Sequence, residues 1–189
     1  CIESVSRQST ALGRLRTARA VSDGKVLLAG PSGTKQLKEY IDRLSHEVDL
    51  CLIDGALSRM SFGSPCITDA MILSTGAAVS ASLPTMVAKT RFTYELTQLP
   101  KFQGDNIDDL KQKENGIFAV SEDEIIDLDI PSLLMIDRYK DRIFEHGRRI
   151  FVSGVLNEQF MQFVCTQKQI GSVEIIIRDF TKNLASADS

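Results

Sequence analysis

The sequence predicts an α/β protein with a mostly parallel sheet and flanking helices. Two kinds of segment lead to this expectation, because short continuous apolar runs alternate with segments whose apolar residues repeat at helical spacing. A continuous apolar run is typical of a strand covered on both faces, as in a parallel sheet. The 189 residues are 43% hydrophobic and 25% charged, so the chain can bury a large core without a disulfide or a metal ion.

The clearest unit is a strand, a helix and a second strand within residues 26–53. Residues 26–29 and 50–53 are continuous apolar runs, the second within a strand predicted at residues 49–53. Residues 34–47 between them have the pattern of a one-faced helix. The apolar positions of that helix are Leu37, Tyr40, Ile41 and Leu44. This order requires a right-handed crossover and parallel pairing of the two strands.

A hairpin is predicted immediately before this unit. Residues 14–30 contain two strand-like stretches joined at Ser22, Asp23 and Gly24, where Asp-Gly supplies the positive φ angles of a tight turn. The second strand of the hairpin is the apolar run at residues 26–29.

A long loop is predicted after the second apolar run. Residues 55–68 are small and turn-prone, and loops of this length in compact domains are usually lids or ligand loops. A third apolar run follows at residues 70–73. Residues 83–98 are then predicted to form a helix with Pro84 in its first turn.

The composition changes near residues 101–115, where we expect a boundary between a first domain (1–100) and a second domain (101–189). Nine acidic residues lie between Gly104 and Asp129, against Lys111 and Lys113 only. A solvated connector and strand edge explains them, and a surface for a cation or a basic partner is the alternative. The carboxylates lack the spacing of a calcium-binding loop.

The second domain is also predicted to be α/β, and smaller. Strands are expected at residues 117–120, 133–136, 149–152 and 172–178, with helices at residues 138–146 and 155–167.

Composition excludes several classes of function. A formal net charge of −3 and the absence of Trp disfavour nucleic-acid binding. No apolar run approaches the roughly 18 residues that span a bilayer, so a cytoplasmic protein without membrane contact is expected. The four cysteines form no C-x-x-C pair, which disfavours a zinc site. The chain begins at Cys1, and we interpret it as a fragment of a longer protein.

The first candidate site is the loop from Gly30 through Ser32, Gly33 and Thr34 to Lys35, between a predicted strand and a predicted helix. Backbone N–H groups at such a helix start point toward an anion. The loop is shorter than a Walker A loop, G-x-x-x-x-G-K-[ST], so an anion contact and a plain strand-to-helix turn both remain open.

The second candidate is Asp54, which follows the apolar run of residues 50–53. An acid at the carboxyl end of a buried strand resembles the Walker B aspartate, whose carboxylate holds magnesium. Many parallel strands end in Asp without that role, so the pattern alone leaves both interpretations open. Neither His46 nor His146 lies near a nucleophile elbow, which disfavours a hydrolase triad.

Four short motifs resemble the P-loop reactivating protein associated with lysine 5,6-aminomutase, an enzyme of lysine fermentation. The matching residues are Ala29-Gly30-Pro31, Ile53-Asp54-Gly55-Ala56-Leu57, Ser64-Pro65-Cys66-Ile67-Thr68-Asp69-Ala70 and Thr75-Gly76-Ala77. Residues 9–14 and 177–179 are also similar, so the resemblance covers most of the chain. The family's Walker A loop lies upstream of the matching region, and this chain has none.

The resemblance implies an incomplete P-loop NTPase-like domain of a chaperone-like ATPase. Such a protein uses ATP and Mg²⁺ to exchange damaged cobalamin from an adenosylcobalamin-dependent aminomutase, acting with a second reactivase subunit. Asp54 would hold magnesium, with Gly55, Ser64, Thr68 and Asp69 in the adjacent ligand loop. Two alternatives are a non-catalytic α/β interaction module and a ligase resembling dethiobiotin synthetase.

Overall fold

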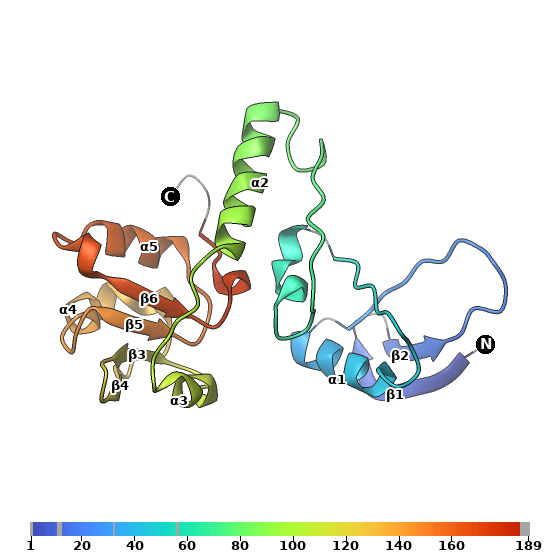
Figure 1. Cartoon of the computed structure of the whole chain (residues 1–189), viewed down its shortest axis with the longest axis horizontal. Coiled ribbons are helices and arrows are strands. Elements are labelled where there is room, and N and C mark those ends of the chain that lie inside the picture. Colours follow the sequence, from blue (N-terminus) through green and yellow to red (C-terminus); the bar gives the residue numbers. More distant parts are fainter. Residues whose placement is uncertain (1, 11–12, 32, 56, 186–189) are drawn as a thin grey trace. The chain divides into compact units, whose positions relative to one another are not determined.

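The structure is a computed structural model that describes residues 2–10, 13–31, 33–55 and 57–185. The chain divides into two compact units, one within residues 1–70 and the other within residues 71–189. The helices and strands of both units are labelled in Figure 1.

The first unit contains a two-stranded antiparallel sheet and one α-helix. Strand β1 (Ile2–Thr10) pairs with β2 (Gly13–Ala18), from Ile2 opposite Ala18 to Thr10 opposite Gly13. Helix α1 (Thr34–Leu44) lies within the predicted helix of residues 34–47 and is tied to β2 by Tyr40, whose hydroxyl donates to Thr17 Oγ1 at 3.0 Å. A 3₁₀ helix, η1 (Leu57–Gly63), occupies the predicted long loop.

Of the strands predicted between residues 14 and 73, only the first strand of the hairpin is present, as β2. Residues 26–29, 49–53 and 70–73 lie outside every strand, so neither the strand-helix-strand unit nor the hairpin at Asp23-Gly24 is present. Strand β2 pairs instead with β1. The apolar side chains of these runs are exposed, with relative exposures of 101% at Leu27 and 83% at Leu52.

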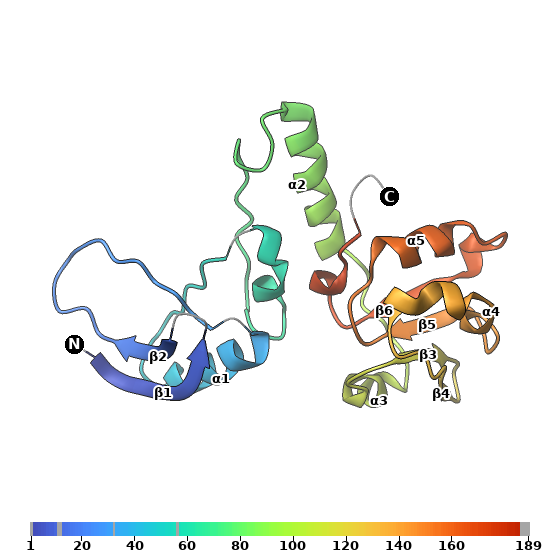
Figure 2. The same cartoon turned by 180° about the vertical axis from the view of Figure 1, so that it is seen from behind.

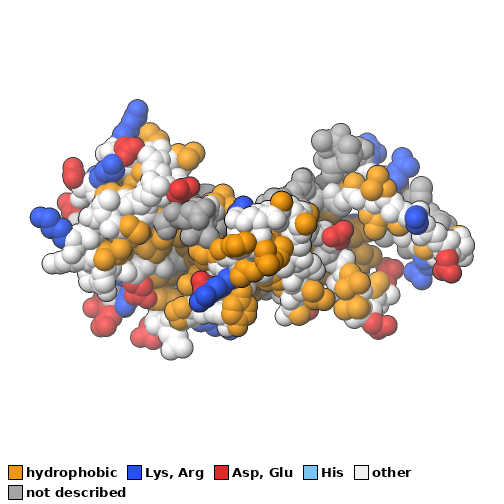
Figure 3. Space-filling view, turned by 90° about the horizontal axis from the view of Figure 1, so that it is seen from above, with side chains coloured by type: hydrophobic (Ala, Val, Ile, Leu, Met, Phe, Trp, Pro, Cys, Tyr) orange, Lys and Arg blue, Asp and Glu red, His pale blue; other side chains and the backbone are white. Residues whose placement is uncertain are grey.

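These apolar runs do not form strands because no helix or neighbouring strand in the described part of the unit packs on them. A continuous apolar run becomes a strand when neighbours complete its hydrogen bonds and pack on both faces. In the described part of the first unit, α1 is the only α-helix, and Leu37 is its only buried residue. Hydrophobic side chains therefore remain at the surface, and such side chains are visible on the face drawn in Figure 3.

The second unit contains a mixed four-stranded sheet in the order β4-β3-β5-β6, seen from two sides in Figures 1 and 2. Its central strand β3 runs antiparallel to both β4 and β5, whereas β5 and β6 are parallel. The strands are β3 (Ile117–Val120), β4 (Ile125–Asp127), β5 (Arg149–Val152) and β6 (Glu174–Ile177). The chain is thus of the α/β class, with a mixed sheet.

Helices surround this sheet. The α-helices of the second unit are α2 (Leu83–Thr97), α3 (Ile107–Gln112), α4 (Lys140–Ile143) and α5 (Glu158–Cys165). The 3₁₀ helices are η2 (Leu133–Arg138), η3 (Ile170–Ser172) and η4 (Phe180–Lys182). Helix α5 connects the parallel strands β5 and β6, so the second unit contains the strand-helix-strand arrangement that the first lacks.

Several predictions for the second unit are confirmed and one is wrong. Strands are present where they were predicted at residues 117–120, 149–152 and within 172–178, and α2 matches the helix predicted at residues 83–98. The strand predicted at residues 133–136 is instead η2. Ser132 starts it, because its side chain accepts a hydrogen bond from the Leu134 N–H and so favours a helical turn.

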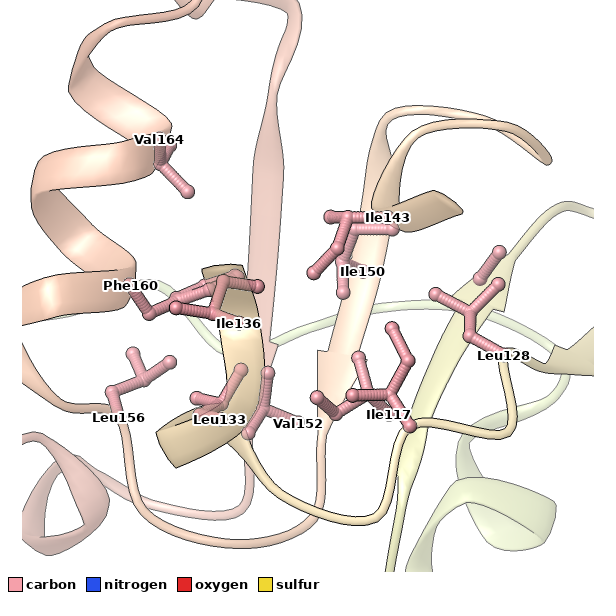
Figure 4. Close-up of a cluster of buried hydrophobic side chains, with 12 residues drawn as sticks. Ile117, Leu128, Leu133, Ile136, Ile143, Ile150, Val152, Leu156, Phe160 and Val164 are labelled. Atoms are coloured by element: carbon pink, nitrogen blue, oxygen red, sulfur yellow. The ribbon is translucent and has the colours of Figure 1, made fainter. Parts of the chain in front are cut away.

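The core lies on both faces of this sheet. On one face Ile117, Ile150 and Val152 pack with Phe160 of α5 and Ile136 of η2, as Figure 4 shows. On the opposite face the alternate residues Phe118 and Phe151 pack with Leu110 of α3. Because side chains pack on both faces of the sheet, the apolar residues of its strands are removed from water on either side.

Arg178 joins three segments next to this sheet. It follows β6 directly, and its guanidinium donates to the backbone carbonyls of Ser153, Lys111 and Lys113. It thereby ties the end of β6 to the segment after β5 and to the end of α3.

Candidate functional site

Asp54 is exposed at the end of an extended apolar segment. In the described part of the chain its carboxylate makes no hydrogen bond or ion pair, so both oxygens are open to a ligand. Gly55 follows it, and a Cβ atom at that position would lie in ordinary van der Waals contact with the Phe62 side chain. The structure thus gives Asp54 an accessible carboxylate near η1.

The loop before α1 has an open helix start. Gly33 is the N-cap residue and Thr34 is the first helical residue, and among the described residues no side chain caps the free N–H groups. The Gly33 carbonyl accepts the Leu37 N–H at 3.0 Å, which closes the first turn. Gly30 is exposed, and a Cβ atom added there would have no other atom within 4 Å. Ser32 lies outside the described residues.

Ser64 and Thr68 form one hydrogen-bonded turn after η1. The Ser64 carbonyl accepts both the Thr68 N–H at 3.1 Å and the Thr68 hydroxyl at 3.2 Å. The Ser64 hydroxyl accepts the Cys66 N–H at 3.3 Å, and Ser64 is buried. Both hydroxyls are therefore used within the turn, whereas Asp69, one residue later, is exposed.

Lys38 connects this turn to α1. Its ammonium donates to the Cys66 carbonyl at 3.0 Å across 28 residues of sequence. Ser64 and Thr68, which the resemblance places in a ligand loop, are thus linked to the helix that begins at Thr34. No hydrogen bond or ion pair among the described residues joins Asp54 to either of these parts.

The candidate residues supply one accessible carboxylate and one helix start. Magnesium is bound by one or two carboxylates together with water and substrate phosphates. Asp54 supplies one such carboxylate, but no group of three potential metal-ligating side chains is present within the described ranges.

The structure adds a depression that sequence reasoning missed. It has a volume of about 360 Å³ and lies in the acidic stretch of the second unit. Its lining residues are Asn106, Asp109, Gln112, Lys113, Asp123, Glu124 and Ile125. The acidic stretch is therefore more than a connector, because it also contains α3, β3 and β4. Ile107 and Leu110, spaced i and i+3, were the sequence signal for α3.

Comparisons with known proteins return nothing: no family model, no curated protein and no solved structure matches this chain. Among the helices in the described ranges, none combines the length and the apolar character needed to cross a bilayer.

Proposed function

We propose that this chain is part of a chaperone-like ATPase that reactivates an adenosylcobalamin-dependent aminomutase of the lysine 5,6-aminomutase type. The observation that carries the proposal is the free, exposed carboxylate of Asp54 directly after an apolar extended segment. It sits within the Ile53-Asp54-Gly55-Ala56-Leu57 motif, to which the sequence resemblance assigns magnesium binding.

Two further features support this proposal. The turn at Ser64 and Thr68 is linked through Lys38 to α1, so a ligand loop and a helix with an uncapped start belong to one unit. The exposed apolar runs before α1 and before Asp54 have the composition of strands buried in a parallel sheet. A P-loop ATPase needs these strands in such a sheet, with Asp54 at its carboxyl edge.

The proposed partners are ATP with Mg²⁺, the aminomutase and a second reactivase subunit. In this arrangement Asp54 holds the magnesium ion, and the phosphate-wrapping loop comes from a further segment of the ATPase. In this proposal Gly30, Gly33 and Thr34 contact an anion at the start of α1.

Replacement of Asp54 tests the proposal. In the complete ATPase, assayed with its aminomutase, Asp54→Ala is expected to abolish ATP turnover, because the variant lacks the proposed magnesium ligand. Asp49→Ala is the matched control, since Asp49 is an exposed acid at the other end of the same apolar segment. Circular dichroism checks that both variants remain folded. Wild-type turnover in folded Asp54→Ala would refute the role of Asp54.

A non-catalytic interaction module is the second candidate, and the exposed apolar runs favour it specifically. Leu27, Leu28 and Ile72 are each more than four-fifths exposed. Large exposed apolar surfaces usually mark protein–protein contacts. The two functions differ in one observable, because only the ATPase predicts that Asp54→Ala changes nucleotide turnover.

A further inference from the structure

The second unit holds an asparagine that is followed directly by a glycine. Asn115 lies in the short segment between α3 and β3, and it is exposed. In such a pair the backbone nitrogen of the glycine can reach the side-chain carbonyl carbon of the asparagine, because glycine has no Cβ atom to hinder the approach. The sequence contains four asparagines, and only Asn115 precedes a glycine.

The other three asparagines are held by hydrogen bonds. The side-chain amide of Asn106 donates to a backbone carbonyl at 3.0 Å. The side-chain oxygens of Asn157 and Asn183 accept backbone N–H groups at 2.8 Å and 3.0 Å. A residue bulkier than glycine follows each of the three. These contacts oppose the rotation that would bring the side-chain carbon toward the next backbone nitrogen.

The reacting atoms of Asn115 and Gly116 have no such restraint. Among the described residues, neither the Asn115 side chain nor the Gly116 N–H makes a hydrogen bond. The Gly116 carbonyl, by contrast, accepts the Ser153 N–H at 3.2 Å and the Ser153 hydroxyl at 2.9 Å. The nitrogen that would attack and the carbon that it would attack are therefore both unengaged.

The fold itself requires glycine at position 116. Its φ of 120° lies in the left-handed region, which side chains rarely allow. A Cβ atom there would also lie 2.9 Å from the ring of Phe118. The neighbour that makes Asn115 reactive is thus fixed by the local backbone.

We propose that Asn115 is a site of spontaneous deamidation, at which water converts the asparagine into aspartate and isoaspartate. The Gly116 nitrogen bonds to Cγ of Asn115 and loses its proton, and the side-chain nitrogen leaves as ammonia. Water then opens the resulting cyclic imide. Opening at Cγ gives aspartate, whereas opening at the main-chain carbonyl carbon gives isoaspartate, whose main chain runs through the former side chain. This inference stands independently of the proposed ATPase function.

Isoaspartate would lengthen the main chain between two anchored carbonyls. The Lys113 carbonyl accepts a hydrogen bond from Arg178, and the Gly116 carbonyl accepts those from Ser153. Isoaspartate inserts one methylene group between these anchors, directly before β3, whose four residues are all buried. We therefore expect isoaspartate to loosen these contacts, and aspartate to leave them intact.

Peptide mapping by mass spectrometry tests the site. The full chain is incubated in warm, mildly alkaline buffer, where the reaction is faster because the attacking nitrogen must lose a proton. Deamidation is expected to be about tenfold or more faster at Asn115 than at any other asparagine. The Asp-Gly pairs at residues 23–24 and 54–55 do not disturb this readout, since isomerisation of aspartate leaves the mass unchanged. Deamidation at another asparagine as fast as at Asn115 would overturn the proposal.

Asn115→Gln is the matched control. It keeps the amide but places it one methylene group further from the Gly116 nitrogen, so the larger imide ring closes more slowly. This variant should release far less ammonia than the wild type. Ammonia release at the wild-type rate would refute the assignment to Asn115.

A synthetic peptide of residues 111–120 tests whether the fold leaves the site open. Deamidation of Asn115 should proceed at a comparable rate in the peptide and in the full chain, because no hydrogen bond restrains the reacting atoms in the described structure. A strongly reduced rate in the full chain would show that the fold protects Asn115, which would also overturn the proposal.

Urea denaturation tests the structural consequence. The isoaspartate form, separated by chromatography from the aged chain, should unfold at a lower urea concentration than the unmodified chain. Asn115→Asp should match the wild type, because residue 115 is exposed. Equal stability of the isoaspartate form and Asn115→Asp would contradict the expected loosening.

Discussion

Arg178 shows how one side chain holds several segments of the second unit. Its guanidinium donates to carbonyls after β5 and at the end of α3, so it substitutes for backbone pairing where no strand continues. The planar fork of arginine reaches several acceptors at once, which a lysine ammonium on a single flexible stem does less well.

Loss of these bonds should lower the stability of the second unit. Arg178→Ala is expected to reduce the free energy of unfolding by about 1 kcal/mol, because three carbonyls lose a charged donor at an exposed site. Arg178→Lys should recover only part of the loss. Arg138→Ala is the control, since Arg138 is exposed and makes no hydrogen bond or ion pair among the described residues. Urea denaturation measures all three, and equal stability of Arg178→Ala and Arg138→Ala would contradict the role.

The surroundings of a candidate residue were predictable where they depend on its sequence neighbours. The exposure of Asp54 follows from an acid after an apolar run, and the helix beginning at Thr34 follows from apolar spacing. The use of the Ser64 and Thr68 hydroxyls inside a turn was not predictable. Their partners are backbone atoms whose positions depend on how the loop folds back, and sequence patterns do not encode that.

At the scale of elements, helix starts are decided by single caps. Asn157 caps α5, because its side-chain oxygen accepts the Phe160 N–H at 2.8 Å. Helix α5 in turn supplies Phe160 and Val164 to the main core. The cap thus fixes the point at which the chain turns from β5 into the helix that covers it.

Removing this cap should destabilise the unit without changing its fold. Asn157→Ala is expected to cost about 1 kcal/mol in the free energy of unfolding, whereas Asn157→Asp should keep most of it. Thermal denaturation followed by circular dichroism measures both. Indistinguishable melting of the alanine variant and the wild type would show that the cap contributes nothing.

Strands were predicted correctly where other elements pack on both faces of the apolar run, and incorrectly where no element packs on it. The runs at residues 117–120 and 149–152 are strands because α3 packs on one face and α5 with η2 on the other. The equally apolar runs at residues 26–29 and 50–53 lie outside every strand and are largely exposed. Their sequences cannot be told apart by periodicity, so the difference comes from packing alone.

On the scale of the whole molecule, the two units differ in how much apolar surface they bury. Both clusters of buried hydrophobic residues in the described chain lie in the second unit. The first unit has a two-stranded sheet, and isolated two-stranded sheets are at best marginally stable in water. Local unfolding should therefore require less free energy in the first unit than in the second.

Hydrogen exchange of the 189-residue chain measures that difference. Backbone amides of residues 26–29 and 50–53 should exchange nearly as fast as in an unfolded peptide, because no ladder protects them. Amides of β3 and β5 should exchange slowest, since both strands lie inside the sheet and are buried. Comparable protection in both sets would mean that the apolar runs pair in solution.

The sequence by itself determined the α/β class, the positions of α1, α2, β3, β5 and β6, and the accessible acid at Asp54. These features depend on local spacing and on residue chemistry. Only the tertiary structure decided that the sheet is mixed, that β2 pairs with β1, and that three apolar runs stay unpaired. The reason is that a strand needs neighbouring strands for its hydrogen bonds and packed side chains on its faces. Which segments become those neighbours depends on how the whole chain packs, and local sequence patterns do not specify it.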